Sequence, residues 1–505
     1  MSPYRYSPQT WHRPGVEGTG VSTLTPDDTK GPQLKLSAIL AFTAANFPLG
    51  CLAVAVAVYL PPYFASHLGV SMAAVGGAWA TVRLLDLAVD PVLGLVMDRT
   101  QTRFGRYRPW MVIGVPILMA SVYALFMAPH GVGLGYLIVW LLIYYLATSI
   151  LILGHSAWGA TLSPGYHERS RIFGIVAAVG VIGAVIILLI PIFSKALGYR
   201  DSAAVPQMGW FILLISPLAV MMTIATTPEP RNRAVSSEPF HIRDYLSLLI
   251  KPDLLRLFLA QMGLTLGPGW MSALYLFYFT ECLGYTPAVA SGLLLLYILA
   301  GVFGAPLSAR LSRRLGKHRT LMVTTTAYSL GLCTLMIIPK GNVAAGLAPM
   351  FWCGFMASGF DLMIRAMLAD LGDQVRLEQG KDQLSLIYAL NTLATKIAGA
   401  FAIGLTFPLL ERLGYVAREG VRNTPAAIHN LQLAYIIGPI IFVMLGGFCV
   451  MGWRLTAERH DEIRKALEDI DQGLPPYDEA PILESLSTRP GHAVLPDQGR
   501  ADAGS

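Results

Sequence analysis

The sequence predicts an all-α membrane protein with twelve transmembrane helices in two six-helix halves, and three observations support this. Hydrophobic residues make up 54% of the 505 residues and charged residues only 13%, which is far more apolar than a soluble chain of this length. Apolar runs of about 20 residues, long enough to cross a bilayer, occur twelve times. A polar, proline-containing segment separates the first six runs from the last six.

The apolar runs follow one another with short polar loops, and they define the expected domains. In the first half, residues 35–227, they lie at residues 36–65, 73–97, 109–129, 133–159, 172–196 and 207–227. In the second half, residues 253–455, they lie at residues 253–280, 287–308, 320–339, 344–369, 384–410 and 429–454. Residues 228–252, rich in Pro, Ser and charge, are expected to link the two halves.

Both tails are polar. Residues 1–34 lack the basic and apolar segments of a signal peptide, so the first helix is expected to be retained. Residues 456–505 begin with a short charged helix pattern and then turn to Pro, Asp and Glu, which indicates a cytoplasmic helix followed by a disordered tail.

The basic residues predict the orientation. With a cytoplasmic N-terminus, the outside loops hold six of the 37 Lys and Arg residues and the inside segments hold 28, so the positive-inside rule places both termini in the cytoplasm. The pI near 9.0 then reflects charge beside anionic lipid, and no nucleic-acid partner is inferred. The five cysteines lie in apolar runs without paired spacing, which is typical of small buried hydrophobes rather than disulfides or metal ligands.

Three ionisable residues lie inside the second apolar run. Arg83, Asp86 and Asp90 are spaced by three and four residues, so they share one helix face, and that face cannot meet lipid. Two carboxylates about one turn apart repel each other unless a cation or a proton lies between them. Pro91 has no N–H and leaves the carbonyl of Leu87 free as a neutral ligand. The pattern favours a cation site over the alternative, a structural ion pair between Arg83 and Asp86.

A basic loop repeats in the two halves. DRTQTRFGRYRPW follows the second apolar run and SARLSRRLGKHRTL follows the eighth, as expected of the parallel repeats of major facilitator transporters. In the first loop we expect a cytoplasmic gate that breaks on inward opening; anionic headgroup binding is the alternative. The expected gate residues are Asp98, Arg99, Arg103, Gly105 and Arg106.

The stretch DLAVDPVLGLVMDRTQTRFGRYRPW resembles the signature of the glycoside-pentoside-hexuronide:cation symporters, the melibiose permease family, within the major facilitator superfamily. The stretch LNTLATKIAGAFA, residues 390–402, is similar to the eleventh helix of the same family. The resemblance is collinear from the first helix to the twelfth. It implies the major facilitator fold and cation-coupled symport of a sugar, glycoside or related small organic solute by alternating access.

The resemblance places Lys396, with Thr392 one turn earlier, near the cation site, where the lysine helps to couple the two halves; snorkelling to the interface is the alternative. The coupling ion is H+ or Na+. Val89 and Leu151 replace neutral oxygen ligands of sodium-using relatives, which favours the proton because a proton needs only one basic oxygen. With both acids ionised, Arg83 and Lys396 balance Asp86 and Asp90, so a bound cation leaves one positive charge uncompensated.

The sugar-contacting residues differ from those of the melibiose permease. Gly50 and Gly154 stand where that protein has acidic residues and Val179 where it has an arginine, which argues against a galactoside, although Trp158 is retained. His155 lies three residues before Trp158 and is expected to face the substrate cavity, with a packing histidine as the alternative.

Asp361 and Arg365 lie four residues apart in the tenth apolar run, and the position of Asp361 corresponds to an aromatic residue of the family's sugar pocket. They are candidates for the substrate cavity; a self-contained intrahelical ion pair is the alternative.

The sequence contains no recognisable phosphate-binding loop, paired metal-ligand spacing or nucleophile with a base, so we expect no enzyme, no cofactor and no metal except Na+ at Asp86 and Asp90. The partners expected are a small-molecule substrate, the coupling cation and the lipid bilayer. We expect a monomer in the inner (plasma) membrane. The alternatives to a sugar symporter are a symporter of an amphipathic solute such as a lysolipid, and a non-transporting membrane sensor.

Overall fold

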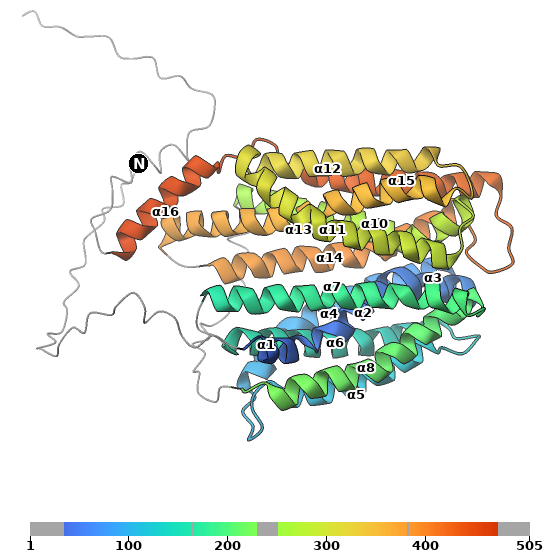
Figure 1. Ribbon diagram of the computed structural model, residues 1–505, viewed down its shortest axis with the longest axis horizontal. Helices are drawn as coiled ribbons and strands as arrows, with labels where there is room; N and C mark the ends of the chain where they lie inside the picture. The colour runs from blue at the N-terminus through green and yellow to red at the C-terminus, as the bar shows by residue number, and fades with distance from the viewer. Residues whose placement is uncertain (1–34, 163–165, 230–250, 381–382, 473–505) are drawn as a thin grey trace, which may run out of the picture.

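The computed structural model describes residues 35–162, 166–229, 251–380 and 383–472, and this part of the chain is almost entirely helical (Figure 1). The first span is built from short pieces: α1 (Leu36–Thr43), α2 (Asn46–Val54), a π-helical turn, α3 (Leu60–Pro62) and a second π-helical turn that ends at His67. The other five helices of this half are α4 (Met72–Arg99), α5 (Arg108–Phe126), α6 (Leu134–Leu162), α7 (Tyr166–Ala196) and α8 (Ala204–Thr226).

The second half repeats this arrangement. Its helices are α10 (Pro252–Phe277), which continues through a π-helical turn to Cys282, α11 (Pro287–Leu315), α12 (Lys317–Thr334), α13 (Val343–Gln379), α14 (Leu384–Arg412) and α15 (Pro425–Cys449). The short helix α16 (Ala457–Asp471) follows, where the sequence predicts a charged cytoplasmic helix. The domain boundaries stay a prediction, because residues 1–34, 230–250 and 473–505 lie outside the described residues.

Each of the twelve apolar runs is helical in the structure. Within the described residues, ten helices are long and apolar enough to cross a membrane, and α4 and α10 are not among them. In α4 the charges of Arg83, Asp86 and Asp90 lower the hydropathy of a helix that is otherwise apolar.

Local sequence signals set the helix ends. The hydroxyl oxygens of Ser71, Thr286 and Thr424 each accept a hydrogen bond from a backbone N–H in the first turn of α4, α11 and α15. At the other end of α11, Gly316 has φ +85°, a conformation that favours glycine and stops the helix before α12.

The two halves meet along α4 and α14 and along α7 and α11. Figure 1 shows α10–α15 on one side of this contact and α1–α8 on the other. We call the end of the molecule that carries α16 and the loop of residues 100–107 the α16 end, and the end that carries residues 68–71 and 413–424 the opposite end.

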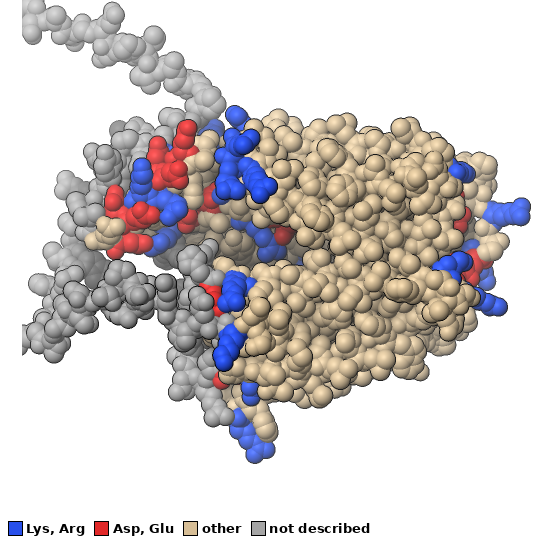
Figure 2. All heavy atoms as spheres, viewed as in Figure 1, with Lys and Arg blue, Asp and Glu red and all other residues tan. Residues whose placement is uncertain are grey.

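Polar contacts join the halves at the opposite end. The Tyr59 hydroxyl lies 2.6 Å from the Ser291 hydroxyl, and the Ala73 N–H at the start of α4 donates to the Glu411 carboxylate. Figure 2 shows a broad surface without charged residues between two charged ends, and a recess between the halves at the α16 end. The uncharged belt is the surface that a bilayer would cover.

Candidate functional site

The charged residues of α4 meet a lysine of the other half. Asp86, only 2% exposed, accepts hydrogen bonds from Lys396 Nζ of α14 at 2.8 Å through Oδ2 and from Ser149 Oγ of α6 at 3.0 Å through Oδ1. Arg83 Nη1 lies 3.7 Å from Asp86 Oδ2. The structure therefore brings three helices together around one buried carboxylate.

Lys396 also pairs with Asp90, one turn along α4. Its ammonium thus lies between the two acids, where the sequence analysis required a positive charge to relieve their repulsion. Asp90 Oδ1 is buried and has no hydrogen-bond partner within the described residues. A buried acceptor of this kind is able to take a proton or a cation.

Arg83 faces a cavity of about 180 Å3 beside this cluster. Its guanidinium lies 4.4 Å from the ring centroid of Tyr145, a cation–π arrangement. Gly399 of α14 lies next to the guanidinium, where an added Cβ would be in ordinary contact at 3.5 Å from Arg83 Nη2. The arginine therefore lines the cavity with a guanidinium whose contact with Asp86, at 3.7 Å, is longer than a hydrogen bond.

Thr392 does not join the cluster. It is exposed, and its hydroxyl donates to the carbonyl of Tyr388 at 3.0 Å. The neutral oxygen near Asp86 comes instead from Ser149, which the sequence analysis missed. Ser149 lies two residues before Leu151. Its contact with Asp86 depends on how α6 packs against α4, which the sequence alone does not show.

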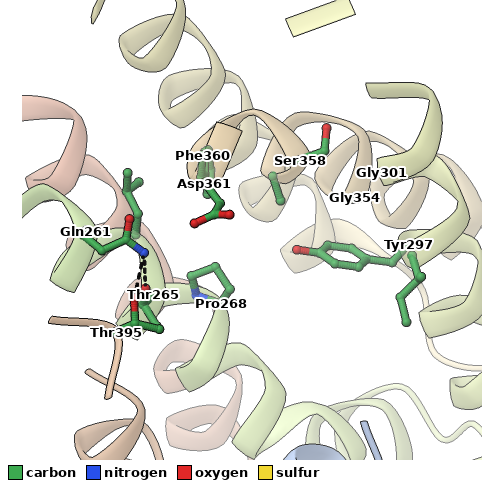
Figure 3. A pocket seen from close by; sticks show the side chains of 13 residues that line it. Gln261, Thr265, Pro268, Tyr297, Gly301, Gly354, Ser358, Phe360, Asp361 and Thr395 are labelled. Atoms are coloured by element: carbon green, nitrogen blue, oxygen red, sulfur yellow. Dashed lines mark hydrogen bonds between the residues drawn. The ribbon is translucent and has the colours of Figure 1, made fainter. Parts of the chain in front are cut away.

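Asp361 and Arg365 form an ion pair on α13, with 56% and 62% of their side chains exposed. Asp361 also lines a cavity of about 380 Å3 among α10, α11, α13 and α14 (Figure 3). In Figure 3 its carboxylate projects between Gln261, Pro268 and Tyr297. The intrahelical pair and the cavity position, offered above as alternatives, are thus both present.

His155 and Trp158 lie in packed surroundings near the α16 end. His155 Nε2 lies 2.9 Å from the carbonyl oxygen of Phe42, and its ring stacks on Phe42 at 4.2 Å. Trp158 is fully buried and donates from Nε1 to the carbonyl of Pro228 at 3.3 Å. The structure does not bring either residue to the two cavities described above, and their role in the substrate cavity stays a prediction.

The loop between α4 and α5 is anchored by Glu229, a residue that the sequence analysis did not identify. The Glu229 carboxylate accepts from the backbone N–H groups of Arg106 at 2.5 Å, Tyr107 at 2.8 Å and Arg108 at 3.4 Å. Gly105 has φ +116°, and an added Cβ there would lie 2.0 Å from Glu229 Oε2. The positive φ favours glycine, and an added Cβ would displace the Glu229 carboxylate from the loop.

The other predicted gate residues are less constrained. Arg99 is exposed at the end of α4, and the Arg103 guanidinium lies 4.9 Å from the ring centroid of Phe104. The side chain of Asp98 lies outside the described residues. The gate role of the whole loop stays a prediction.

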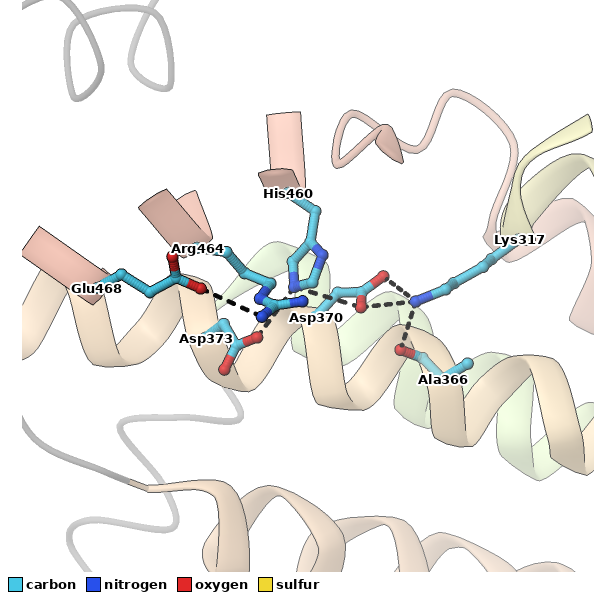
Figure 4. A network of polar contacts seen from close by, with 7 residues as sticks. All are labelled: Lys317, Ala366, Asp370, Asp373, His460, Arg464 and Glu468. Atoms are coloured by element: carbon cyan, nitrogen blue, oxygen red, sulfur yellow. Dashed lines mark hydrogen bonds and ion pairs between the residues drawn. The ribbon is translucent and has the colours of Figure 1, made fainter. Parts of the chain in front are cut away.

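The matching loop of the second half is held by α13. Lys317 at the start of α12 binds both oxygens of Asp370 at 2.6 Å (Figure 4). His460 of α16 lies 2.9 Å from Asp373 and 3.5 Å from Asp370. Each basic loop is thus held by an acidic residue from another segment of the chain, Glu229 after α8 in the first case and Asp370 of α13 in the second.

Two similar helical halves, with ten helices able to cross a membrane among the described residues and a buried ion cluster between the halves, are typical of a membrane transport protein of the two-bundle type. The family model for MFS/sugar transport proteins matches residues 41–457, and the chain belongs to this family.

Several bacterial proteins are similar over most of the chain. An uncharacterized symporter of Bacillus subtilis (strain 168), YnaJ, is 23% identical over 86% of this chain and 95% of its own length. The isoprimeverose transporter of Lactiplantibacillus pentosus is 24% identical over 83% of this chain and 87% of its own. The putative glycoside/cation symporter YagG of Escherichia coli (strain K12) is 23% identical over 81% and 90%.

The crystal structure of the nucleoside transporter NupG matches with a TM-score of 0.61 at 13% identity, over 83% of this chain and all of that one. At this identity the likeness shows the fold alone. Together the comparisons confirm the major facilitator fold and the resemblance to the melibiose permease family. They place this protein in the class of transporters.

Proposed function

We propose that the protein is a cation-coupled symporter that carries a sugar, a glycoside or a related small organic solute by alternating access. One observation carries this proposal: Lys396 of one half binds two acids of the other, and one oxygen of Asp90 has no partner. A cation or proton arriving at Asp90 competes with the Lys396 ammonium for the same carboxylate. Occupancy of this site therefore changes the main ionic contact between the halves.

The charges give coupling a physical basis. The side-chain exposures are 2% for Asp86, 17% for Lys396 and 21% for Asp90, so a change of net charge is poorly screened. Arg83 and Lys396 balance the two acids when the site is empty. A bound cation adds one positive charge, which favours a solute that offers hydrogen-bond acceptors or negative charge to Arg83.

The coupling ion proposed is the proton. The only neutral side-chain oxygen found next to Asp86 among the described residues is that of Ser149, and sodium requires several oxygen ligands. A proton requires one carboxylate oxygen, which Asp90 Oδ1 provides. Sodium is the alternative to test.

The proposal places the α16 end in the cytoplasm of a bacterial cell, with both termini on that side and the protein acting as a monomer in the inner membrane. The basic loops support this orientation, since they lie at the α16 end.

Uptake into proteoliposomes tests the proposal. Isoprimeverose, the sugar named for one relative, is offered together with two further sugars, lactose and raffinose, and a lysolipid under imposed proton or sodium gradients. Wild type and Asp90→Asn are compared, with Asp201→Asn as the control because Asp201 pairs with Lys195 at the opposite end, away from the cluster. We expect gradient-driven uptake that Asp90→Asn abolishes and the control retains. Uptake that ignores both gradients and survives Asp90→Asn would refute coupling at this cluster.

A further inference from the structure

We propose that the turn between α11 and α12 binds an anionic phospholipid from the leaflet at the α16 end, and that a headgroup with two phosphates suits it better than a headgroup with one. The residues that would hold the phosphates form what we call the α11–α12 arginine patch, which consists of Arg310, Arg314 and Arg319. The inference goes beyond the function proposed above. It requires that the chain spans a membrane, and it does not depend on the solute or on the coupling ion.

On α11 the patch continues an exposed apolar stripe. Phe303 and Leu307 are 66% and 45% exposed although they are large and apolar, so this face of the helix would meet the bilayer. Side chains three or four residues apart lie one above the other on a helix, and the stripe therefore runs on into Arg310 and Arg314, which are both exposed. The apolar surface thus ends in two arginines, where the hydrocarbon core gives way to the headgroups.

The start of α12 repeats this pattern. Arg319 is exposed in its first turn, and Val323 and Leu330 on the same face are 45% and 63% exposed. The two helices pack against each other, and Gly316 is the one residue between them. The arginines that end the two stripes are therefore close together. Figure 2 shows basic side chains gathered at the α16 end, next to the uncharged belt.

The charge of the patch is not balanced by the protein. No side-chain hydrogen bond or ion pair is formed by the three patch arginines among the described residues, whereas Lys317 nearby binds both oxygens of Asp370. The matching loop of the first half differs, because Arg108 there donates to the carbonyl of Thr227 at 2.6 Å. The patch thus presents free guanidinium donors.

Phosphate is the group that such donors bind best at a membrane surface. A guanidinium is a planar fork of N–H donors that engages two phosphate oxygens at once, and it remains charged at physiological pH. The apolar stripes beside the patch give acyl chains a surface to lie on, which favours a lipid over a free phosphate compound. A headgroup with two phosphates can meet arginines of both helices, whereas one phosphate meets those of one helix.

Lipid affinity of the purified full chain tests the site. The protein is titrated in an uncharged detergent with cardiolipin, which has two phosphates, or with phosphatidylglycerol, which has one, and native mass spectrometry gives the dissociation constant. Each basic residue near anionic lipid changes the affinity about fivefold, so replacement of all three patch arginines with glutamine should weaken cardiolipin binding roughly a hundredfold. Cardiolipin bound by the triple variant as tightly as by wild type would overturn the proposal.

The matched control compares two consecutive arginines of α11. Arg313 is exposed like Arg314, but consecutive side chains point about 100° apart around a helix, so Arg313 lies outside the stripe. Arg314→Gln should weaken cardiolipin binding about fivefold and Arg313→Gln clearly less. Equal losses in the two variants would mean diffuse attraction to positive charge and would refute a defined site.

A second measurement locates the lipid on the chain. Cardiolipin should slow backbone hydrogen exchange at residues 315–319 in wild type and leave it unchanged in the triple variant. Slowing of the same size in both proteins contradicts the assignment, whatever the affinities are.

Further probes separate the possible sources of phosphate. Pyrophosphate has two phosphate groups and no acyl chains, and phosphatidylcholine has acyl chains and no net charge, so each should bind far more weakly than cardiolipin. Pyrophosphate binding as tight as cardiolipin binding would make this a site for a free phosphate compound and refute the lipid. Equal affinities for phosphatidylglycerol and cardiolipin would refute the preference for two phosphates.

Discussion

Replacing Lys396 with methionine removes the only ammonium found between Asp86 and Asp90 among the described residues and leaves a side chain of similar length. The perturbation breaks two ion pairs at once, and the three side chains are at most 21% exposed. At that burial the stabilisation lost should be similar to that of buried ion pairs, because exposed ion pairs contribute almost nothing. Removal of one partner of a buried pair costs about 3–5 kcal/mol.

That loss of stability is an upper bound for Lys396→Met, because the two acids can lower their repulsion. With Arg83 alone left to balance them, one carboxylate takes up a proton, which replaces part of the lost stabilisation. The double variant Lys396→Met with Asp86→Asn restores a neutral cluster of Arg83 and Asp90. We therefore expect the single variant to be clearly less stable at pH 8 than at pH 6, and the double variant to be less dependent on pH than the single.

The stabilities of these variants are measured by thermal unfolding of the purified proteins, with tryptophan fluorescence as the signal. The chain has nine Trp residues to report unfolding. The reasoning is refuted if Lys396→Met unfolds at the wild-type temperature at pH 8. It is equally refuted if the double variant is destabilised by the sum of the two single variants, since the pair would then be uncoupled.

Three further predictions concern other contacts. Glu229→Gln should destabilise the start of α5 by about 1 kcal/mol because a neutral amide replaces the carboxylate that caps three N–H groups, and hydrogen exchange at residues 106–108 should rise. Gly50→Asp should fail to yield folded protein in size-exclusion chromatography, since the carbonyl of Gly180 occupies the space; a folded variant would contradict the packing of α2 on α7. His460→Ala should speed hydrogen exchange in α16 and leave α12 unchanged, because Lys317 keeps Asp370; equal protection of α16 in both proteins would contradict this.

The sequence predicts the spans well because a bilayer imposes one length and one composition on every one of them. It also predicts that Arg83, Asp86 and Asp90 share a face, since that follows from helical spacing alone. Their partner Lys396 is 310 positions from Asp86, and only the family resemblance placed it near them. Local spacing holds no information on such a distant pairing.

Other features of the site could not be predicted because they also depend on contacts between distant segments. Glu229 follows a membrane span as one charge among several, and nothing local shows that it binds the backbone 121 to 123 residues earlier. For His155 and Trp158 the difficulty is different. Both faces of a membrane helix are apolar, so spacing cannot tell the side packed against neighbouring helices from the side that lines a cavity.

The pairing of two acids with one arginine and one lysine also has an electrical consequence. Under the symport proposed above, an empty cluster with no net charge would move no charge across the membrane when the carrier reorients, so the membrane voltage would neither assist nor oppose its return. A cluster loaded with one cation and a neutral solute would carry charge, and about 2.3 kcal/mol per 100 mV would then act on that step alone. In the proposed cycle, the balance of these four side chains therefore decides which half of the cycle the cell's voltage drives.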